Sequence, residues 1–528
     1  MKRERNKKMD LSNKICELRK KYGISEERFA ELIKTDCRTV KEWQSGEGVP
    51  NADELLRICS VFEITADELL SDGCNAKNPY RTLEMQEWEY EWEGYHETFM
   101  TEYRQLTEEG SDVSQYKDLF EAAAKLPDGR IKRKLSDVIF EIARTAKRVD
   151  GYSYIEPSEL DKIKALSDGG KRTRIEKTDA RLKNKIEGAW MGRICGCLLG
   201  KPVEGKKTYE LHPLLKRSGN FPMHRYIVSD DITDEMIEKY GYKRDWYWAD
   251  KMECAPSDDD TNYIVLAQLL IERYGRNFTP DDVAKIWTEK QPKSAYCTAE
   301  RVAYLNFMKG YCPPESATHK NVFREWIGAQ IRGDYFGYIN PGDPETAAEM
   351  AWRDASISHT KNGIYGEMFI AAMIAEAAVC DDITEIIKAG LAQIPKTSRL
   401  HESICNVLEW HKNGMSCDEC FAKIHKLYDE NNSHDWTHTI SNAMIVCIAL
   451  LYGEGDFGKS ICLAVQTGFD TDCNGATVGS VLGMRNGIDG IGDEWKKPVA
   501  GKLDTTIFGV GRVSIVDMAE KTIGHIEG

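Results

Sequence analysis

Five aspartates in two short stretches are the residues best suited to chemistry. Asp258, Asp259 and Asp260 lie in "APSDDDTNYIVLAQLLIERYG", and Asp470 and Asp472 lie in "GFDTDCNGATVGSVLG". Each stretch opens an apolar segment with a helical pattern, where carboxylates suit the positive end of the helix dipole. Burying so many carboxylates without a cation is costly, and divalent cations such as Mg²⁺ prefer oxygen ligands. The pair of clusters therefore predicts a binuclear metal site, although three aspartates in a row also occur on solvated loops.

Two series of glycines accompany the aspartates. Glycines recur every four residues in "IEGAWMGRICGCLLGKPVEG", at positions 188, 192, 196 and 200, and again at 475, 479 and 483. On a helix this spacing forms a ridge that another backbone can approach closely, which would offset the roughly 1 kcal/mol that each glycine costs a helix. We expect each ridge to lie against a core helix. If the two ridges pack together, segments 201–205 and 469–473 share one site; otherwise each ridge packs elsewhere.

Five motifs make the stretch from Ile186 to Ile523 resemble the ADP-ribosylglycohydrolases. In chain order they are "GAWMGRICGCLLGKPVEG", "SDDDTNYIVL", "INPGDPETAAEMAWRDASISHTKNGIYGEMFIAAMIAEA", "DWTHTISNAMIVCIALL" and "GFDTDCNGATVGSVLG". The resemblance implies an all-helical domain that binds two Mg²⁺ (or Mn²⁺) ions through the two aspartate clusters. It also implies an enzyme that removes ADP-ribose from a modified protein, nucleic acid or small molecule.

By the same resemblance, Glu204 matches the acidic residue that follows the first helix of the family. Hydrolysis at the anomeric carbon of ribose passes through an oxocarbenium-like state, which a nearby carboxylate can stabilise. Such a carboxylate can also take a proton from the attacking water. We therefore expect Glu204 to be catalytic. A surface carboxylate in a Pro-Val-Glu-Gly turn is the alternative.

The sequence departs from the family pattern at two positions. Asp258 stands where the family usually has threonine or serine, unless Ser257 supplies that hydroxyl, and Cys473 replaces a threonine whose hydroxyl reaches the metal. A thiol is a poor Mg²⁺ ligand, so water would take one coordination position there. We expect Ser257, His359, Asn442 and Cys473 to lie at the substrate, with a core histidine as the alternative for His359.

The N-terminal segment has the pattern of a helix-turn-helix. Short helices are expected after the N-caps Ser25 and Asp36, and residues 15–70 resemble the Cro/phage-repressor family down to "TVKEWQSGEGVPNADELL". That resemblance makes residues 37–44 the recognition helix, with Arg38, Thr39 and Lys41 facing duplex DNA. Glu26 stands where the family usually has a glutamine that touches phosphate, which predicts weaker binding. A helical bundle used for protein contacts or dimerisation is the alternative.

These patterns predict an all-α chain in three parts. Residues 10–73 form a small five-helix DNA-binding domain, 74–180 a helical connector without a motif, and 181–528 the catalytic domain. The connector is expected to hold a packed helix over 83–110 and a helix pair around residues 127–129. His434 and His438 have a helical spacing that metals use, but no glutamate follows the first histidine, so a zinc site there is disfavoured.

Composition limits the class of protein. A net charge of −15 argues against nucleic-acid binding along the whole surface, but residues 1–46 hold thirteen Lys/Arg against eight Asp/Glu. No apolar run is long enough to cross a membrane, and the 16 cysteines lack framework spacing, as expected for a reduced cytoplasmic protein. We expect a metal-dependent hydrolase fused to a DNA-binding module, able to form a homodimer. The alternative is a transcriptional regulator that senses ADP-ribose or a related nucleotide without turnover.

Overall fold

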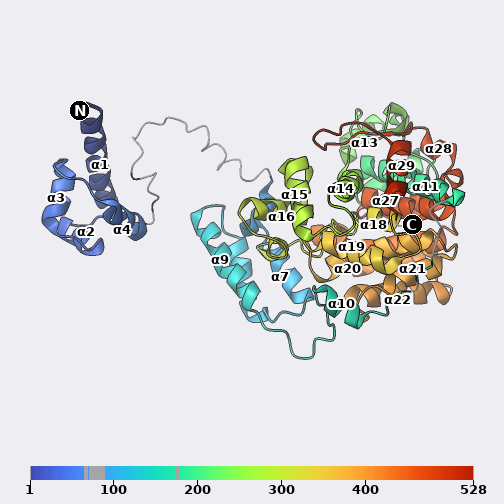
Figure 1. Ribbon diagram of the computed structural model, residues 1–528, viewed down its shortest axis with the longest axis horizontal. Coiled ribbons are helices and arrows are strands. Elements are labelled where there is room, and N and C mark those ends of the chain that lie inside the picture. The colour runs from blue at the N-terminus through green and yellow to red at the C-terminus, as the bar shows by residue number, and fades with distance from the viewer. Residues whose placement is uncertain are drawn as a thin grey trace. The chain divides into compact units, whose positions relative to one another are not determined.

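The chain folds as two compact units, residues Met1–Glu89 and Tyr90–Gly528. The structure is a computed structural model that describes residues 2–62, 64, 69, 90–170, 172, 173 and 179–526. Helices dominate both units (Figure 1), and the described strands are the short antiparallel pair β1 (Lys502–Leu503) and β2 (Val513–Ser514). No helix among the described residues is long and apolar enough to pass through a bilayer. The predicted all-α fold is confirmed.

The first unit contains the expected helix-turn-helix. Its helices are α1 (Lys2–Lys21), α2 (Glu26–Leu32), α3 (Cys37–Ser45) and α4 (Ala52–Phe62). Ser25 caps α2 and Asp36 caps α3 through backbone N–H groups, and α3 ends at Gly46, whose φ of 78° suits glycine. Val40 and Trp43 are buried with Phe29 and Ile58 in one core. Of the fifth helix expected at 65–70, only residue 69 lies within the described residues.

The second unit begins with the connector. It contains η1 (Glu91–Glu93), η2 (Tyr95–Glu97), α7 (Phe99–Glu108), η3 (Ser114–Tyr116), α8 (Lys117–Ala124), α9 (Arg130–Thr145) and α10 (Leu160–Leu166). The helix pair around residues 127–129 is confirmed as α8 and α9. The single helix expected over 83–110 is wrong in its first part, because residues 91–97 form two 3₁₀ turns in which Tyr95 points inward. Residues 83–89 lie outside the described part.

The body of the second unit is built from helices of 4 to 21 residues. Its first half contains α11 (Ala180–Gly200), η4 (Lys201–Val203), α12 (Thr208–Arg217), η5 (Ser229–Asp231), α13 (Asp234–Tyr240), η6 (Ala249–Lys251), α14 (Asp259–Tyr274), α15 (Pro280–Lys290), η7 (Lys293–Ala295), α16 (Thr298–Met308), α17 (Glu315–Thr318) and α18 (Asp334–Tyr338). The second half contains α19 (Pro344–Ala355), α20 (Lys361–Ala377), α21 (Ile383–Leu391), α22 (Arg399–Lys412), α23 (Cys417–Leu427), α24 (Ser433–Trp436), α25 (Thr439–Tyr452), α26 (Phe457–Gln466), α27 (Thr471–Asn486), η8 (Ile488–Gly490), α28 (Asp493–Lys496) and α29 (Ile515–His525).

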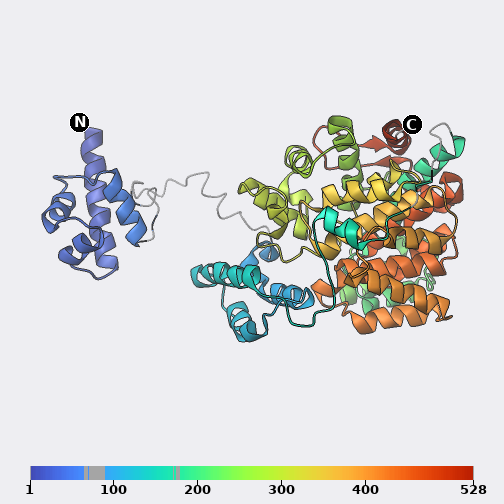
Figure 2. The same ribbon diagram turned by 60° about the horizontal axis from the view of Figure 1, so that its bottom comes forward.

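The connector packs against this body. In both views its blue-to-cyan helices lie beside the yellow-green segment that contains α16 (Figure 1, Figure 2). Tyr95 and Phe99 of the connector share an apolar core with Val302 of α16 and with Phe323 and Trp326. Because these side chains are buried together, residues 90–146 fold as part of the second unit.

The two glycine ridges pack directly against each other. A methyl group added at Gly192 would lie 2.1 Å from the carbonyl oxygen of Gly479, and one added at Gly196 would lie 1.9 Å from that of Gly475. The helices α11 and α27 therefore touch backbone to backbone along their length. At the end of the contact, Gly200 meets Asp472, and the Thr471 hydroxyl donates to the Gly200 carbonyl at 3.0 Å. The mutual contact, which the sequence left as one of two possibilities, is confirmed.

This contact predicts a large effect for Gly192→Ala. The new methyl group can be accommodated only if the two backbones separate, so we expect a loss of about 3 kcal/mol or more in unfolding free energy. Urea unfolding followed by near-ultraviolet circular dichroism measures it. The control is Gly524→Ala in α29, where no atom lies within 4 Å of the added methyl group. It should stabilise the protein by up to about 1 kcal/mol. Equal effects of the two variants would contradict the packing argument.

Candidate active site

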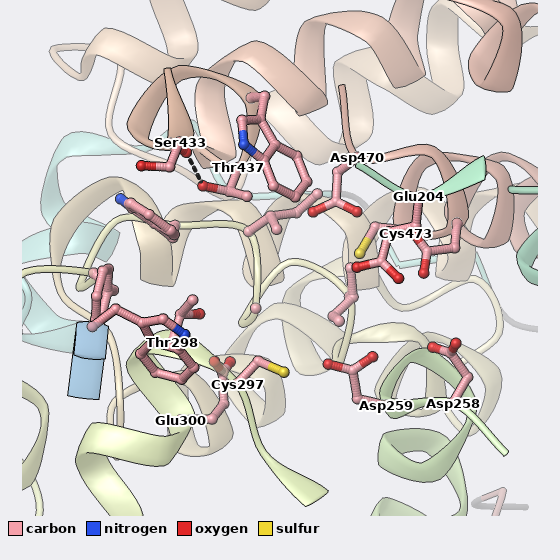
Figure 3. Close-up of a pocket in the computed structure, with 18 of the residues that line it drawn as sticks. Glu204, Asp258, Asp259, Cys297, Thr298, Glu300, Ser433, Thr437, Asp470 and Cys473 are labelled. Atoms are coloured by element: carbon pink, nitrogen blue, oxygen red, sulfur yellow. Dashed lines mark hydrogen bonds between the residues drawn. The ribbon is translucent and has the colours of Figure 1, made fainter. Parts of the chain in front are cut away.

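The helix contact brings the two aspartate clusters to one cavity. The cavity has a volume of about 820 Å³, and Glu204, Asp258, Asp259, Asp470 and Asp472 line it together with Ser257 and Cys473. Figure 3 shows the labelled carboxylates of Glu204, Asp258, Asp259 and Asp470 gathered at one end, while Thr298, Glu300, Ser433 and Thr437 lie at the other. Residues more than 200 positions apart in the chain thus form one acidic surface.

Asp258 is held by a lysine that the sequence did not single out. It is the N-cap of α14, where its Oδ1 accepts from the Asp260 N–H at 3.0 Å, and its Oδ2 accepts from Lys201 Nζ. Burial opposes ionisation, but the Lys201 charge and hydrogen bond hold the pKa of Asp258 below its ordinary value. Both carboxylate oxygens of Asp258 are therefore engaged within the protein.

Asp260 lies behind the cavity wall, on a buried arginine. Arg193 Nη2 donates to Asp260 Oδ1 at 2.8 Å, and its Nη1 donates to Asp334 Oδ2 at 2.7 Å. The three side chains have no exposed area, so this ion pair is screened very little. Arg193, the one charge within the first glycine series, anchors α14 to α11.

Glu204, Asp470 and Asp472 form no ion pair with any described residue. Burial and the charge of Asp472 raise the pKa of Asp470 well above its ordinary value, and burial followed by the Asp258 charge raises the pKa of Asp472 to about 6. The Asp472 charge, with burial, also raises the pKa of Glu204. Each shift has the direction expected when like charges crowd in a site with too few cations.

Two buried oxygens of this cluster show that its residues fit divalent cations. Asp260 Oδ2 and Asp472 Oδ1 are buried and form no hydrogen bond with any residue that the structure describes. A buried carboxylate oxygen without a donor is unfavourable, and cations bound by oxygen ligands would remove that cost. The described positive groups near the cluster, Lys201 and Arg193, are already paired with Asp258, Asp260 and Asp334.

Two residues expected at the substrate do not line the cavity. His359 is 1% exposed, its Nδ1 bonds to the Ser358 hydroxyl at 2.8 Å, and burial together with the Arg332 charge lowers its pKa well below its ordinary value. Asn442 is fully buried in α25, and its Oδ1 accepts from the Asp470 N–H and from the Asn474 amide. Neither side chain lines the cavity where both were expected, and Asn442 instead positions the loop that carries Asp470.

The cavity wall includes residues that sequence reasoning missed. Trp92, Thr98 and Thr101 of the connector line it, and so does Glu300 of α16. Glu300 accepts from Arg332 Nη1 at 2.8 Å, and burial raises its pKa to about 7. The one sequence signal for a connector residue at the cavity was the run of aromatic residues in "EWEYEWEGYHETF". Such a run more often packs in a core.

Buried ion pairs hold the connector in place. Arg324 donates to Glu102 and to Glu109, each at 2.8 Å, and Lys361 donates to Glu109 at 2.8 Å. Burial by itself would raise the pKa of Glu109, but the Arg324 and Lys361 charges lower this pKa to about 2. Ahead of α7, the buried Glu93 pairs with Arg301 and, at 3.0 Å, with Lys293. The wall formed by Trp92 and Thr98 is therefore fixed from both sides.

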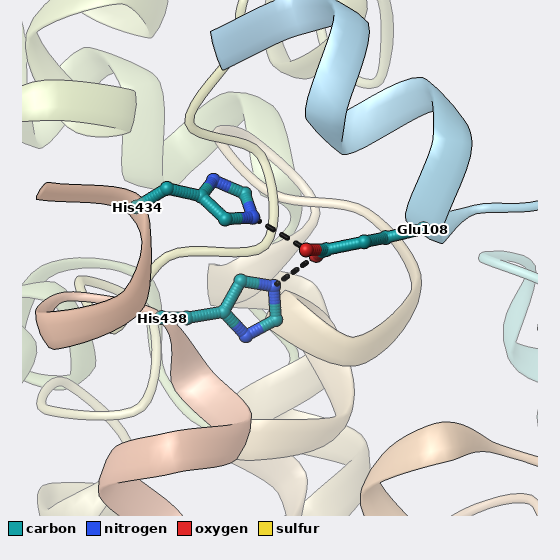
Figure 4. Close-up of side chains that lie close together, drawn as sticks. All are labelled: Glu108, His434 and His438. Atoms are coloured by element: carbon teal, nitrogen blue, oxygen red, sulfur yellow. Dashed lines mark hydrogen bonds and ion pairs between the residues drawn. The ribbon is translucent and has the colours of Figure 1, made fainter. Parts of the chain in front are cut away.

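A third contact joins α7 to the loop before α25 (Figure 4). His434 Nε2 lies 2.9 Å from Glu108 Oε2, and His438 Nε2 lies 4.0 Å from the same oxygen. The set resembles a metal site in composition, but Trp326 Nε1–H donates to His434 Nδ1 and the Ile440 N–H donates to His438 Nδ1. An accepting Nδ1 places the proton on Nε2 of each neutral ring. His434 Nε2–H therefore donates to Glu108, while His438 Nε2–H is buried without a hydrogen-bond partner among the described residues, and neither protonated nitrogen can bind an ion.

Comparison with known proteins agrees with the resemblance. The family model described as ADP-ribosylglycohydrolase matches residues 178–526, well over half of the chain. The chain belongs to the ADP-ribosylglycohydrolase family. A solved structure titled "ADP-ribosylglycohydrolase-related protein complex" is similar at 18% identity and a TM-score of 0.42, covering 65% of this chain and 97% of the other. The family match begins after the connector, so Trp92, Thr98 and Thr101 lie outside it.

The N-terminal part of the chain is similar to transcriptional regulators. It is 35% identical over 63 residues to "HTH-type transcriptional activator BcrR" of Enterococcus faecalis, covering 12% of this chain and 31% of the activator. It is 30% identical over 59 residues to "Uncharacterized HTH-type transcriptional regulator YgzD" of Bacillus subtilis, covering 11% of this chain and 89% of the regulator. The expected helix-turn-helix resemblance is confirmed. The matched segment spans less than a third of the length of BcrR.

The buried pairs of the connector predict the effect of Arg324→Ala. The change leaves Glu102 and Glu109 without their shared partner, which should destabilise the second unit by about 3–5 kcal/mol. Limited proteolysis should then cleave within residues 90–110. Arg144→Ala removes an exposed partner of Glu141 in the same connector and should leave the stability nearly unchanged. An Arg324→Ala protein as stable and as protease-resistant as the control would refute the role of these pairs.

Proposed function

We propose that this ADP-ribosylglycohydrolase cleaves the glycosidic bond that joins ADP-ribose to a modified group, with divalent cations in the carboxylate cluster. The supporting observation is that Glu204, Asp258, Asp259, Asp470 and Asp472 line one cavity, in which Asp472 keeps a buried oxygen without a donor among the described residues. Mg²⁺ or Mn²⁺ bound there would orient the ribose hydroxyls and acidify water. A binding protein without turnover would have no need for Glu204 beside the clusters.

The position of each residue in the cavity indicates the role it would have in the reaction. Asp259, Asp470 and Asp472 would hold the cations at the ribose, and Lys201 would keep Asp258 in place as the cap of α14. Glu204 would accept the proton of the attacking water and would stabilise positive charge at the anomeric carbon. The half-buried Ser257 lines the cavity beside Asp258 and could supply a hydroxyl to the ribose. The aromatic and hydroxyl side chains at the other end of the cavity would contact the rest of the substrate.

The first unit would bind duplex DNA through α3. Arg38 and Lys41 are exposed, which suits contacts to phosphates, while the Thr39 hydroxyl is bonded to Asp36. Glu26 lies 3.8 Å from Lys41 and 3.7 Å from Arg19, and Arg38 pairs with Glu42 at 3.0 Å. These carboxylates compete with phosphate for the basic groups. We expect modest affinity for DNA and regulation of a target promoter, with a homodimer reading a two-fold operator.

Release of free ADP-ribose tests the hydrolase. The full chain, supplied with divalent cation, should release ADP-ribose from ADP-ribosylated arginine, serine or nucleic acid. Asp259→Asn should lower the rate by about 100-fold or more, a loss comparable to removing one group that stabilises a transition state. Because it relieves crowding of carboxylates, the variant should unfold at no lower temperature than the parent in the presence of a chelator.

The matched control is Asp281→Asn, in the first turn of α15 on the protein surface. It should leave the rate of ADP-ribose release unchanged. If the parent protein binds ADP-ribose but releases none from any of the three substrate classes, the protein is a sensor and the hydrolase proposal fails.

Removing the Glu26 charge tests DNA binding. Glu26→Gln frees Lys41 and Arg19 for phosphate, so duplex affinity should rise several-fold. The slope of log K against log salt should steepen by up to about 1. Fluorescence anisotropy at several salt concentrations measures both. Glu17→Gln removes an equal charge from exposed α1 and should have a smaller effect. Equal gains in affinity for the two variants would show that net charge causes the effect. If no variant binds DNA in a salt-dependent way, DNA binding is excluded.

A further inference from the structure

Two buried thiols lie among the carboxylates of the candidate active site. Cys197 comes from α11 and Cys473 from α27, the two helices joined by the glycine contact, and they are 3% and 7% exposed. The potential ligand atoms of Cys197, Asp258 and Asp260 all lie within 4.8 Å of one another, as do those of Asp260, Asp472 and Cys473. Each three-residue group thus contains one sulfur, and Asp260 belongs to both.

The group that contains Cys473 is the one whose ligand atoms remain available to a metal ion. Its carboxylates contribute the two buried oxygens without a hydrogen-bond donor, Asp260 Oδ2 and Asp472 Oδ1. In the other group, both oxygens of Asp258 are occupied by Lys201 and by the backbone of α14. Two members of this group, Asp472 and Cys473, line the cavity, whereas Cys197 and Asp260 lie behind it, so an entering ion reaches Cys473 and Asp472 first (Figure 3).

The chemistry of this donor set differs from that of an all-oxygen site. Mg²⁺ is a hard ion that takes oxygen ligands and keeps much of its water, whereas thiolate sulfur favours Zn²⁺ and related ions. Two carboxylates and one thiolate therefore suit a borderline divalent ion. A bound ion of this kind deprotonates a coordinating thiol, so binding releases the Cys473 proton to solvent as the metal–sulfur bond forms.

We propose that Asp260, Asp472 and Cys473 bind a thiophilic divalent cation of the Zn²⁺ class in preference to Mg²⁺, with the Cys473 sulfur as a ligand. The proposal rests on the proposed function in one respect, that the ion lies at the ribose end of the same cavity. It gives Cys473 a role in selecting the metal of the hydrolase.

Cobalt serves as the spectroscopic probe of this site. Metal-free full-length protein titrated with Co²⁺ should develop a near-ultraviolet thiolate-to-cobalt charge-transfer band, which Zn²⁺ abolishes and excess Mg²⁺ does not. Calorimetry should show tighter binding of Zn²⁺ than of Mg²⁺. Cys473→Thr replaces sulfur by a hydroxyl, so the band should disappear and Zn²⁺ affinity should fall at least about tenfold, since even outer-shell changes cost 10–100-fold. Its Mg²⁺ affinity should be equal or higher.

Matched variants separate Cys473 from the other thiols. Cys297 lines the same cavity but belongs to neither three-residue group, so Cys297→Ser should keep the band and the metal preference. Cys473→Ser serves if Cys473→Thr does not fold, and retained Mg²⁺ binding shows that the site is intact. Absence of the band in the parent, its survival in both Cys473 variants, or tighter binding of Mg²⁺ than of Zn²⁺ overturns the proposal.

The metal proposal and the hydrolase proposal fail in different ways. A cobalt–thiolate band lost in Cys473→Thr, without release of ADP-ribose under any metal, leaves the metal site standing and removes the enzymatic function. Release of ADP-ribose with Mg²⁺ at equal rates in the parent and Cys473→Thr, with no band in either, supports the hydrolase and refutes a ligand role for the sulfur.

Discussion

Backbone contact between α11 and α27 is the constraint on which the rest of the second unit depends. Gly192 and Gly479 face each other without side chains, so the two helices approach more closely than ordinary helices, whose axes lie 8–10 Å apart. At one end of this contact, Gly200 lies against the first turn of α27. The turn that carries Glu204 and the loop that carries Asp470 are consequently held side by side, which no local interaction in either segment could achieve.

This close approach concentrates negative charge beyond what the protein itself neutralises. Lys201 and Arg193 each engage one aspartate of the first cluster, while Asp472 keeps an oxygen without a donor. The stability of the helix contact and the affinity of the site for cations are therefore linked. Packing stabilises an arrangement of carboxylates that would be unfavourable by itself, and bound cations would lower the free energy of the same folded state.

The connector adds residues from outside the family match to the cavity wall. Its α7 is docked by buried pairs centred on Arg324, and the turns before α7 place Trp92 and Thr98 on the cavity wall. Buried charges between the connector and the body thus determine part of the cavity wall. In the first unit, ion pairs with Glu26 and Glu42 partly neutralise the basic side chains Lys41 and Arg38.

The sequence by itself determined the local elements and the chemical type of the site. N-caps at Ser25 and Asp36, glycine ends, the regular glycine spacing and the paired acidic runs are short-range patterns, and each corresponds to a feature of the structure. The tertiary structure decided which side chains meet. His359 and Asn442 lie behind the cavity wall, Asp258 pairs with Lys201, and Trp92 lines the cavity. The tertiary structure also showed that His434 donates to Glu108 and that His438 lies beside the same carboxylate. Such pairings depend on contacts between residues far apart in the chain, and the energies of those contacts are set by burial and charge in the folded state rather than by neighbours in sequence.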